Sequence, residues 1–184
     1  MKRVRLVFSG SGGQGVITAA IILAEAAVVQ ENRNATQSQS YGAAARGGAT
    51  RSDVIISDAE IDFPVVSQPN ILICLTQEAY SSFGPEIRPG GILLADPRFV
   101  KTIRKVDAQQ VELPMYDMVM QEIGKPIVFN ICVLGALIGL REDLVQPESI
   151  MATIGERVPK DFIAMNRESL QVGLELGRSF GADR

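Results

Sequence analysis

Histidine and tryptophan are absent from this chain of 184 residues, and cysteine occurs only twice. The lack of histidine removes the commonest general base and any histidine-rich metal site. Cys74 and Cys132 each stand in an apolar stretch, so we expect both thiols to be buried and inert. Two isolated thiols cannot hold an iron–sulfur cluster, which needs several cysteine ligands. We therefore expect no metal site in this chain.

The chain also lacks an excess of basic residues and a long apolar run. It has 18 basic against 21 acidic residues, a net charge of −3, which leaves no electrostatic footprint for DNA or RNA. The longest apolar run, Ile127 to Leu140, is interrupted by Asn130 and is shorter than the ~20 residues that cross a bilayer. Glycines follow the basic start where a signal peptide would be apolar. We expect a cytoplasmic protein that binds neither nucleic acid nor membranes.

What the chain has instead is an alternation of strand and helix patterns. Because 46% of its residues are hydrophobic and no linker or repeat divides it, we expect a single domain over residues 1–184. Strand patterns fit residues 4–9, 34–37, 51–57, 71–76, 91–95 and, more weakly, 111–113. Helical patterns cover 14–29, 77–83, 115–123, 127–140, 147–157 and 160–180. The alternation predicts an open three-layer α/β/α fold with a mostly parallel sheet and a helical C-terminal third.

The first predicted helix, 14–29, is apolar on nearly every side, with Thr18 and Glu25 as the exceptions. Such a helix has to be covered on more than one side. We expect a sheet on one side and a partner chain on the other, and hence self-association of the isolated chain.

Two connections are longer than this scheme requires. Residues 38–50 form a polar segment dense in glycine and alanine, and residues 58–70 carry Pro64 and Pro69. Loops of that length in a compact domain are often functional.

The sequence from Gly10 to Gly15 reads GSGGQG and matches the dinucleotide fingerprint G-x-G-x-x-G. It follows a predicted strand and opens a predicted helix, where glycines permit a tight turn and free N–H groups favour an anion. An NAD site also needs an acidic residue about 20 positions further on. Residues 34–39 contain no carboxylate. NAD is therefore disfavoured, whereas a phosphate site and a purely structural turn both stay open.

A second motif lies downstream, where Ser40-Tyr41-Gly42 is followed by Arg46-Gly47-Gly48. Combined with Gly12-Gly13-Gln14-Gly15, it resembles the gamma subunits of 2-oxoacid:ferredoxin oxidoreductases. The similarity continues through Asn130 and residues 134–137, and so covers most of the chain. The Ser-Tyr-Gly loop and residues 51–54 are more similar to the 2-oxoglutarate branch than to the pyruvate branch. This chain departs from the family at residues 43–44, where two alanines replace a common Pro-Glu.

The resemblance implies an enzyme of alpha, beta, gamma and ferredoxin-like delta subunits. It would convert a 2-oxoacid, coenzyme A and oxidised ferredoxin to acyl-CoA, CO2 and reduced ferredoxin. Thiamine diphosphate, magnesium and iron–sulfur clusters would lie on the partner subunits, because this chain lacks both a Gly-Asp-Gly motif and cluster ligands. The gamma chain would complete the assembly, contact coenzyme A and be inactive alone. Pyruvate, branched-chain oxoacids and indolepyruvate remain alternative substrates, and a stand-alone nucleotide-binding protein remains an alternative function.

The candidate contacts to coenzyme A come from the two glycine-rich segments, and no catalytic residue is predicted. They are Gly12, Gly13, Gln14, Gly15, Tyr41, Arg46, Gly47 and Gly48. Arg46 is the first candidate, because a guanidinium beside open glycine backbone can hold a phosphate through two hydrogen bonds. Its alternative is a structural arginine. Tyr41 could stack on adenine or cap a core edge, and Gln14 could orient a phosphate or only begin the helix.

Other polar residues are expected to have structural roles. Arg51 and Asp53 are expected to form a solvated or interface ion pair. Asn130, in an apolar helix, needs hydrogen-bond partners and is expected to pin a neighbouring loop. Three methionines could form an adaptable contact surface, although core packing is the stronger expectation. They are Met115, Met118 and Met120.

Overall fold

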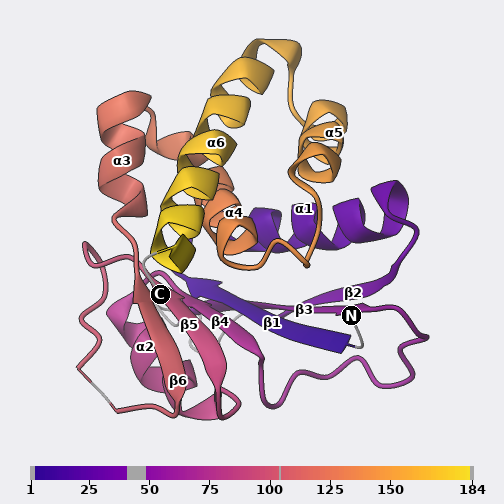
Figure 1. The fold of residues 1–184 in the computed structure, drawn as a ribbon, viewed down its shortest axis with the longest axis vertical. Helices are drawn as coiled ribbons and strands as arrows, with labels where there is room; N and C mark the ends of the chain where they lie inside the picture. Colours follow the sequence, from indigo (N-terminus) through magenta and orange to yellow (C-terminus); the bar gives the residue numbers. More distant parts are fainter. Residues whose placement is uncertain (1–2, 41–48, 104, 183–184) are drawn as a thin grey trace.

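A computed structural model describes residues 3–40, 49–103 and 105–182 of the chain (Figure 1). Six strands form one sheet in the order β2-β3-β1-β4-β5-β6. Their bounds are β1 (Arg3–Gly10), β2 (Asn34–Ser40), β3 (Thr50–Ser57), β4 (Ile71–Cys74), β5 (Gly91–Ala95) and β6 (Ala108–Glu112). Strands β1, β4, β5 and β6 pair in parallel, whereas β3 runs antiparallel to both of its neighbours. The predicted α/β fold with a mostly parallel sheet is confirmed.

The helices also follow the predicted order. Their bounds are α1 (Val16–Glu25), α2 (Gln77–Phe83), α3 (Met115–Glu122), α4 (Phe129–Leu140), α5 (Pro147–Arg157) and α6 (Lys160–Ala182). Three short segments adjoin them: η1 (Ala26–Gln30), a π-helix that continues α1, and the 3-10 turns η2 (Gly84–Glu86) and η3 (Pro126–Val128). The first helix begins later than predicted, because Gly15 has a left-handed backbone with φ of 71°. None of the helices described is both long and apolar enough to cross a bilayer.

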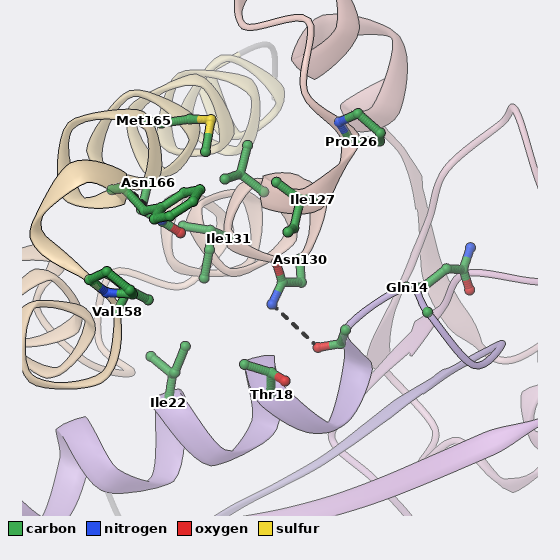
Figure 2. Close-up of a pocket in the computed structure, with 15 residues that line it drawn as sticks. Gln14, Thr18, Ile22, Pro126, Ile127, Asn130, Ile131, Val158, Met165 and Asn166 are labelled. Atoms are coloured by element: carbon green, nitrogen blue, oxygen red, sulfur yellow. Dashed lines mark hydrogen bonds between the residues drawn. The ribbon is translucent and has the colours of Figure 1, made fainter.

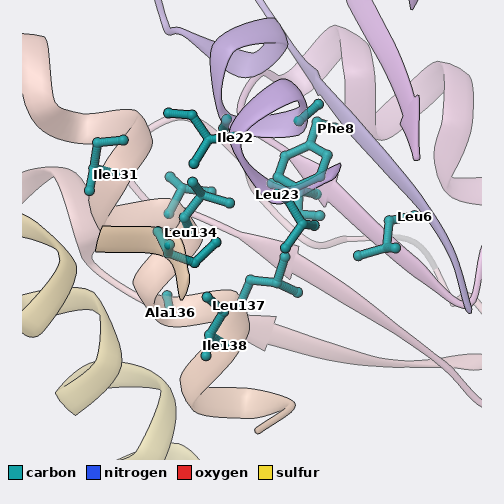
Figure 3. Packing of buried hydrophobic residues seen from close by; sticks show 14 of the residues in the cluster. Leu6, Phe8, Ile22, Leu23, Ile131, Leu134, Ala136, Leu137 and Ile138 are labelled. Carbon is teal, nitrogen blue, oxygen red and sulfur yellow. The ribbon is translucent and has the colours of Figure 1, made fainter. Parts of the chain in front are cut away.

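The sheet is covered on both faces, which gives three layers. Alternate side chains of each strand point to opposite faces, so Leu6 and Phe8 pack with α1 and α4, whereas Val7 packs with α2. Strand β4 divides in the same way, with Ile73 on the first face and Leu72 on the second. Figure 1 shows α2 below the sheet and the other α-helices above it. Each face of the sheet thus has its own hydrophobic core, and Figure 3 shows the core between the sheet and the helices α1 and α4.

Helix α1 is covered by helices of the same chain. Its buried side chains pack between the sheet and the helices α4 and α5, which lie over it (Figure 1). The second cover that its apolar character predicted is therefore internal, and a partner chain is not needed to bury most of it. The apolar residues left exposed lie beyond α1 in η1, where Val28 and Val29 are 44% and 59% exposed.

Helices α4 and α6 meet through glycines spaced four residues apart on each helix. A methyl group placed on Gly135 would lie 2.2 Å from the Leu170 carbonyl oxygen, and one placed on Gly173 would lie 2.1 Å from the Cys132 carbonyl oxygen. Gly139 and Gly177 continue the same contact one turn further on. The two backbones therefore touch directly, at a separation that no larger residue permits.

This contact predicts opposite effects for two glycine-to-alanine substitutions. Gly173→Ala should destabilise the chain by about 3 kcal/mol, because backbone atoms cannot move away as a side chain could. Gly155→Ala in α5 should be neutral or stabilising by roughly 0.4 to 1 kcal/mol, because open space surrounds that position. Thermal unfolding should show the first variant melting roughly 6 to 12 °C below wild type. Equal melting temperatures for both variants would show that the helices can separate without cost.

Candidate functional site

Five of the six strands end at one edge of the sheet. Gly10 at the end of β1 pairs with Thr50 at the start of β3, and Ser40 at the end of β2 pairs with Arg51. The ends of β4, β5 and β6 lie at the same edge, because these strands run parallel to β1. In open α/β sheets this is the edge where ligands bind. Both glycine-rich segments of the sequence leave the sheet here.

The glycine-rich turn after β1 is open to solvent on its outer side. Gly12 and Gly13 are exposed, and a methyl group added to either would meet no atom within 4 Å. Gly13 and Gly15 have φ of 91° and 71°, which favour glycine. Gly15 caps α1, so the free N–H groups of the first helical turn point toward the turn. This geometry suits a phosphate approaching the backbone closely.

Gln14 holds the turn against the sheet. Its Oε1 accepts a hydrogen bond of 2.8 Å from the Ser11 N–H, and its Nε2 donates one of 2.9 Å to the Leu75 carbonyl oxygen. Leu75 follows β4 directly and is buried, so the amide joins the turn after β1 to the end of the neighbouring strand. Both ends of the Gln14 amide are therefore occupied within the chain. Its predicted contact to a cofactor stays a prediction.

Asn130 packs directly against the start of α1. It is 8% exposed, and its Nδ2 donates to the Gly15 carbonyl oxygen over 3.5 Å, shown as the dashed line in Figure 2. A methyl group on Gly15 would lie 2.8 Å from the Asn130 side chain. The expectation that Asn130 pins a neighbouring loop is confirmed, since it fixes the helix start behind the glycine-rich turn.

A pocket of about 400 Å³ opens beside Gly13, Gln14 and Gly15. Three helix beginnings build it, those of α1, α4 and α6, and its walls are mostly apolar (Figure 2). Ile127 and Phe162 stay 73% and 43% exposed at their positions in this lining. The other lining residues are Thr18, Ile22, Pro126, Val128, Asn130, Ile131, Val158, Pro159, Met165 and Asn166. The pocket thus has apolar walls and adjoins a turn whose free N–H groups favour an anion.

Sequence reasoning missed the walls of this pocket. Val158 follows α5, and Phe162 and Met165 come from the start of α6, more than a hundred residues from the turn, and no motif marks them. Ile127 offered an indication of the pocket, because it is an apolar residue at the start of an apolar segment. In the structure it is 73% exposed, whereas the helix that follows it is buried.

The structure places Gly13, Gln14 and Gly15 in the lining of the pocket, and Gly12 precedes them in the same exposed turn. The other predicted contacts, Tyr41, Arg46, Gly47 and Gly48, lie outside the described residues. Their segment connects Ser40 to Thr50, and both of these residues lie at the edge where the glycine-rich turn begins. The convergence of the two segments therefore stays a prediction that the strand register favours.

Arg51 and Asp53 form the expected ion pair, and it is more buried than expected. The Arg51 guanidinium donates to Asp53 at 2.7 Å and to Glu86 at 2.7 Å, and its side chain is 13% exposed. Burial is the largest influence and favours the neutral form, but both carboxylates outweigh it and raise the pKa of Arg51. A further bond of 2.8 Å to the Val66 carbonyl oxygen ties the 58–70 segment to β3. Arg51 is structural.

One carboxylate at this edge of the sheet, that of Asp96, is fully buried. Asp96 follows β5, and its carboxylate accepts hydrogen bonds from the backbone N–H groups of Arg98 and Tyr116, at 2.9 and 2.7 Å. Burial raises the pKa of Asp96 despite these two donors.

Among the described residues, no group of three or more carboxylates or thiols is arranged to hold a metal ion. Met115 is buried, as core packing predicted, whereas Met120 is 39% exposed.

The Gln14 bridge predicts a loss of stability on truncation. Gln14→Ala should cost roughly 1 to 3 kcal/mol, because the buried Leu75 carbonyl loses its side-chain donor and the Ser11 N–H loses its acceptor. Gln171→Ala is the matched control, since that exposed amide donates to the exposed Glu175, and its effect should stay within about 0.5 kcal/mol. Urea denaturation measures both variants. Similar unfolding free energies for the two would mean that the bridge contributes nothing.

The cysteines predict resistance to alkylation. Burial raises the pKa of Cys74 to about 12, and burial together with the charge of Asp96 raises that of Cys132 to about 12. At pH 8 each thiol is then ionised to roughly one part in ten thousand. Iodoacetamide should therefore label neither cysteine in the folded chain and both in urea, as mass spectrometry can count. Rapid labelling of the folded chain would contradict their burial.

Known proteins with similar sequences align with nearly the whole of this chain. The 2-oxoglutarate synthase subunit KorC of Methanocaldococcus jannaschii is 43% identical over 179 residues, covering 96% of this chain and 94% of the relative. KorC of Archaeoglobus fulgidus is 35% identical over 177 residues, covering 96% and 89%. The ketoisovalerate oxidoreductase subunit VorA of Methanothermobacter marburgensis is 29% identical, and the aligned part covers 37% of that longer protein.

Solved structures agree with the fold. The gamma subunit of a keto/oxoacid ferredoxin oxidoreductase from Geobacter sulfurreducens matches with a TM-score of 0.85 and 38% identity, covering 96% of this chain and 99% of that chain. The 2-oxoglutarate:ferredoxin oxidoreductase of Magnetococcus marinus has the same fold over 32% of its chain, covering 97% of this chain, with a TM-score of 0.86 and 19% identity. The family model described as pyruvate ferredoxin/flavodoxin oxidoreductase matches residues 5–176. The resemblance predicted from the glycine-rich motifs is therefore confirmed, and this chain belongs to the pyruvate ferredoxin/flavodoxin oxidoreductase family.

Proposed function

We propose that this chain is the gamma subunit of a 2-oxoglutarate:ferredoxin oxidoreductase. The enzyme would join 2-oxoglutarate and coenzyme A to give succinyl-CoA and CO2, and pass the two electrons singly to ferredoxin. The observation that carries the proposal is the 43% identity with a 2-oxoglutarate synthase subunit over nearly the whole of both chains. Relatives that act on other oxoacids align at lower identity.

The proposed assembly contains alpha, beta and ferredoxin-like delta subunits beside this one. Thiamine diphosphate, magnesium and iron–sulfur clusters belong to those partners, where they supply the decarboxylation and the electron path. This assignment is supported by the donor set of this chain, which has no histidine and whose cysteines are both buried. The contribution of this chain is to bind and orient a substrate at the edge where its strands end.

The proposed substrate at that edge is coenzyme A. Its diphosphate and its 3′-phosphate are anionic groups that suit the free N–H groups at the Gly12 to Gly15 turn. Its long pantetheine arm carries methyl and methylene groups between its two amides, and the neighbouring pocket of about 400 Å³ offers apolar walls at the beginnings of α1, α4 and α6. Arg46 would add a bidentate contact to a phosphate, with Tyr41 against the adenine. Gly47 and Gly48 would let the backbone approach the ligand.

The test is reconstitution of the native complex around this chain. The isolated chain should oxidise no oxoacid and bind NAD no better than free phosphate. Co-expressed with its alpha, beta and delta subunits, it should co-purify with them and give oxidation that depends on coenzyme A and favours 2-oxoglutarate over pyruvate, branched-chain oxoacids and indolepyruvate. A complex that prefers another oxoacid would overturn the substrate, and failure to co-purify would overturn the subunit assignment.

Arg46 gives the sharpest prediction within this proposal. Arg46→Ala should raise the Michaelis constant for coenzyme A by about one to two orders of magnitude, because a charge-assisted contact is lost. Decarboxylation should be nearly unchanged. Arg46→Lys should recover part of the effect, since lysine keeps the charge but makes only single contacts. Arg167→Ala, an exposed position on α6, is the control. An assembled Arg46→Ala complex with an unchanged Michaelis constant for coenzyme A would show that Arg46 is structural.

A further inference from the structure

At the opposite edge of the sheet, three arginines surround a hollow of about 320 Å³. Arg3 and Arg5 lie two residues apart on β1 and so point to the same face, and Arg88 stands just before β5. Arg3 donates to the Glu60 carbonyl oxygen. Within the described part of the chain, none of the three guanidinium groups is paired with a carboxylate. Three unneutralised positive charges thus share one hollow in a chain of net charge −3.

Two large apolar side chains lie beside these arginines. Phe63 and Val65 also line the hollow and are 68% and 51% exposed. Both belong to the 58–70 segment, the long connection whose function the coenzyme A site does not explain. An exposed aromatic residue beside arginines is the composition that distinguishes protein–protein interfaces from ordinary surface, where lysine is commoner.

The segment that carries Phe63 and Val65 is held in place by the sheet. Asn70 binds the backbone of Arg5 twice, accepting from its N–H at 3.0 Å and donating to its carbonyl oxygen at 2.8 Å. The Arg88 N–H donates to the Pro69 carbonyl oxygen at 3.0 Å, and buried Val66 is tied to Arg51. The same bonds that fix the segment therefore fix the backbones of Arg5 and Arg88. The apolar and the basic groups are presented together on rigid backbone.

We propose that this arginine surface, made of Arg3, Arg5, Phe63, Val65 and Arg88, binds an acidic segment of another subunit of the oxidoreductase. Charge complementarity identifies the partner's chemistry: aspartate or glutamate side chains for the guanidinium groups, with an apolar side chain beside them for Phe63. Docking would also relieve the repulsion among the three arginines. The inference rests on the proposed function, because the partner is a subunit of that enzyme.

The surface lies at the amino ends of β1 and β5, whereas the glycine-rich turn lies at the carboxyl ends. A partner bound at the arginine surface would leave the coenzyme A edge free. Variants at the arginine surface should therefore change assembly and leave the Michaelis constant for coenzyme A unaltered. This separates the two sites in a single set of measurements.

The test uses the complex assembled from this chain and its alpha, beta and delta subunits. Arg88→Glu and Phe63→Ala are preferred because both residues are exposed and the fold does not depend on them. Arg88→Glu should weaken association by at least about tenfold and reduce its dependence on salt. Phe63→Ala should weaken it by a similar factor without changing the salt dependence. Arg167→Glu, which makes the same charge change on α6, should have no effect.

A photo-crosslinking phenylalanine analogue at position 63 identifies the occupant. The crosslinked peptide should come from another subunit and be rich in aspartate and glutamate. A crosslink to a second copy of this chain, or to a segment without acidic residues, would overturn the proposal. Unchanged association of both variants would also overturn it. A third contradicting result would be that the isolated chain binds pyrophosphate, and that Arg88→Glu abolishes this binding without changing subunit association. Failure of the wild-type complex to form would instead refute the proposed function itself.

Discussion

The direct backbone contact between α4 and α6 is the constraint on which the upper layer of the molecule depends. Because glycine lets the two helices touch, α6 packs directly on α4, and Ser169 and Gly173 in the middle of α6 lie against Val128 and Cys132 at the beginning of α4. The earlier turns of α6 then extend past the beginning of α4, so Met165 lies across the pocket from Thr18 and Ile22 of α1 (Figure 2), and Phe162 also lines the pocket. A wider helix pair would move Phe162, Met165 and Asn166 away from α1 and so remove one wall of the pocket.

Most of the fold could be predicted from the sequence, because the local pattern of apolar and polar residues indicates most of the helices and strands. Apolar runs indicated most of the strands and helices in their order, and Gly15 accounts for the late start of α1. The predicted helix 127–140 also begins two residues late, at Phe129, after the 3-10 turn η3. The antiparallel insertion of β3 between β1 and β2 is different. Strand order is a property of how distant segments pair, and the alternation of β and α patterns is the same for either order.

The candidate site was predictable only where it coincides with a motif. Gly12 to Gly15 were found because a G-x-G-x-x-G pattern has a known backbone reason. The bridge from Gln14 to Leu75 was not, since it joins a side chain to a backbone carbonyl 61 residues away. The prediction that α1 is covered on a second side was right, but the cover comes from α4 and α5 of the same chain and not from a partner chain. The apolar character of a helix indicates that its surface is buried, but not whether the same chain or another one buries it.

The polar edge strand β2 has a consequence for the subunit before it meets its partners. Strand β2 ends the sheet, and apart from Ala35 its residues are polar: Asn34, Thr36, Gln37, Ser38, Gln39 and Ser40. An open strand edge recruits further strands when it is flat and apolar, and uncontrolled addition leads to aggregates. A hydrophilic final strand lowers that risk. A newly made subunit could thus wait for assembly at appreciable concentration without polymerising through its sheet.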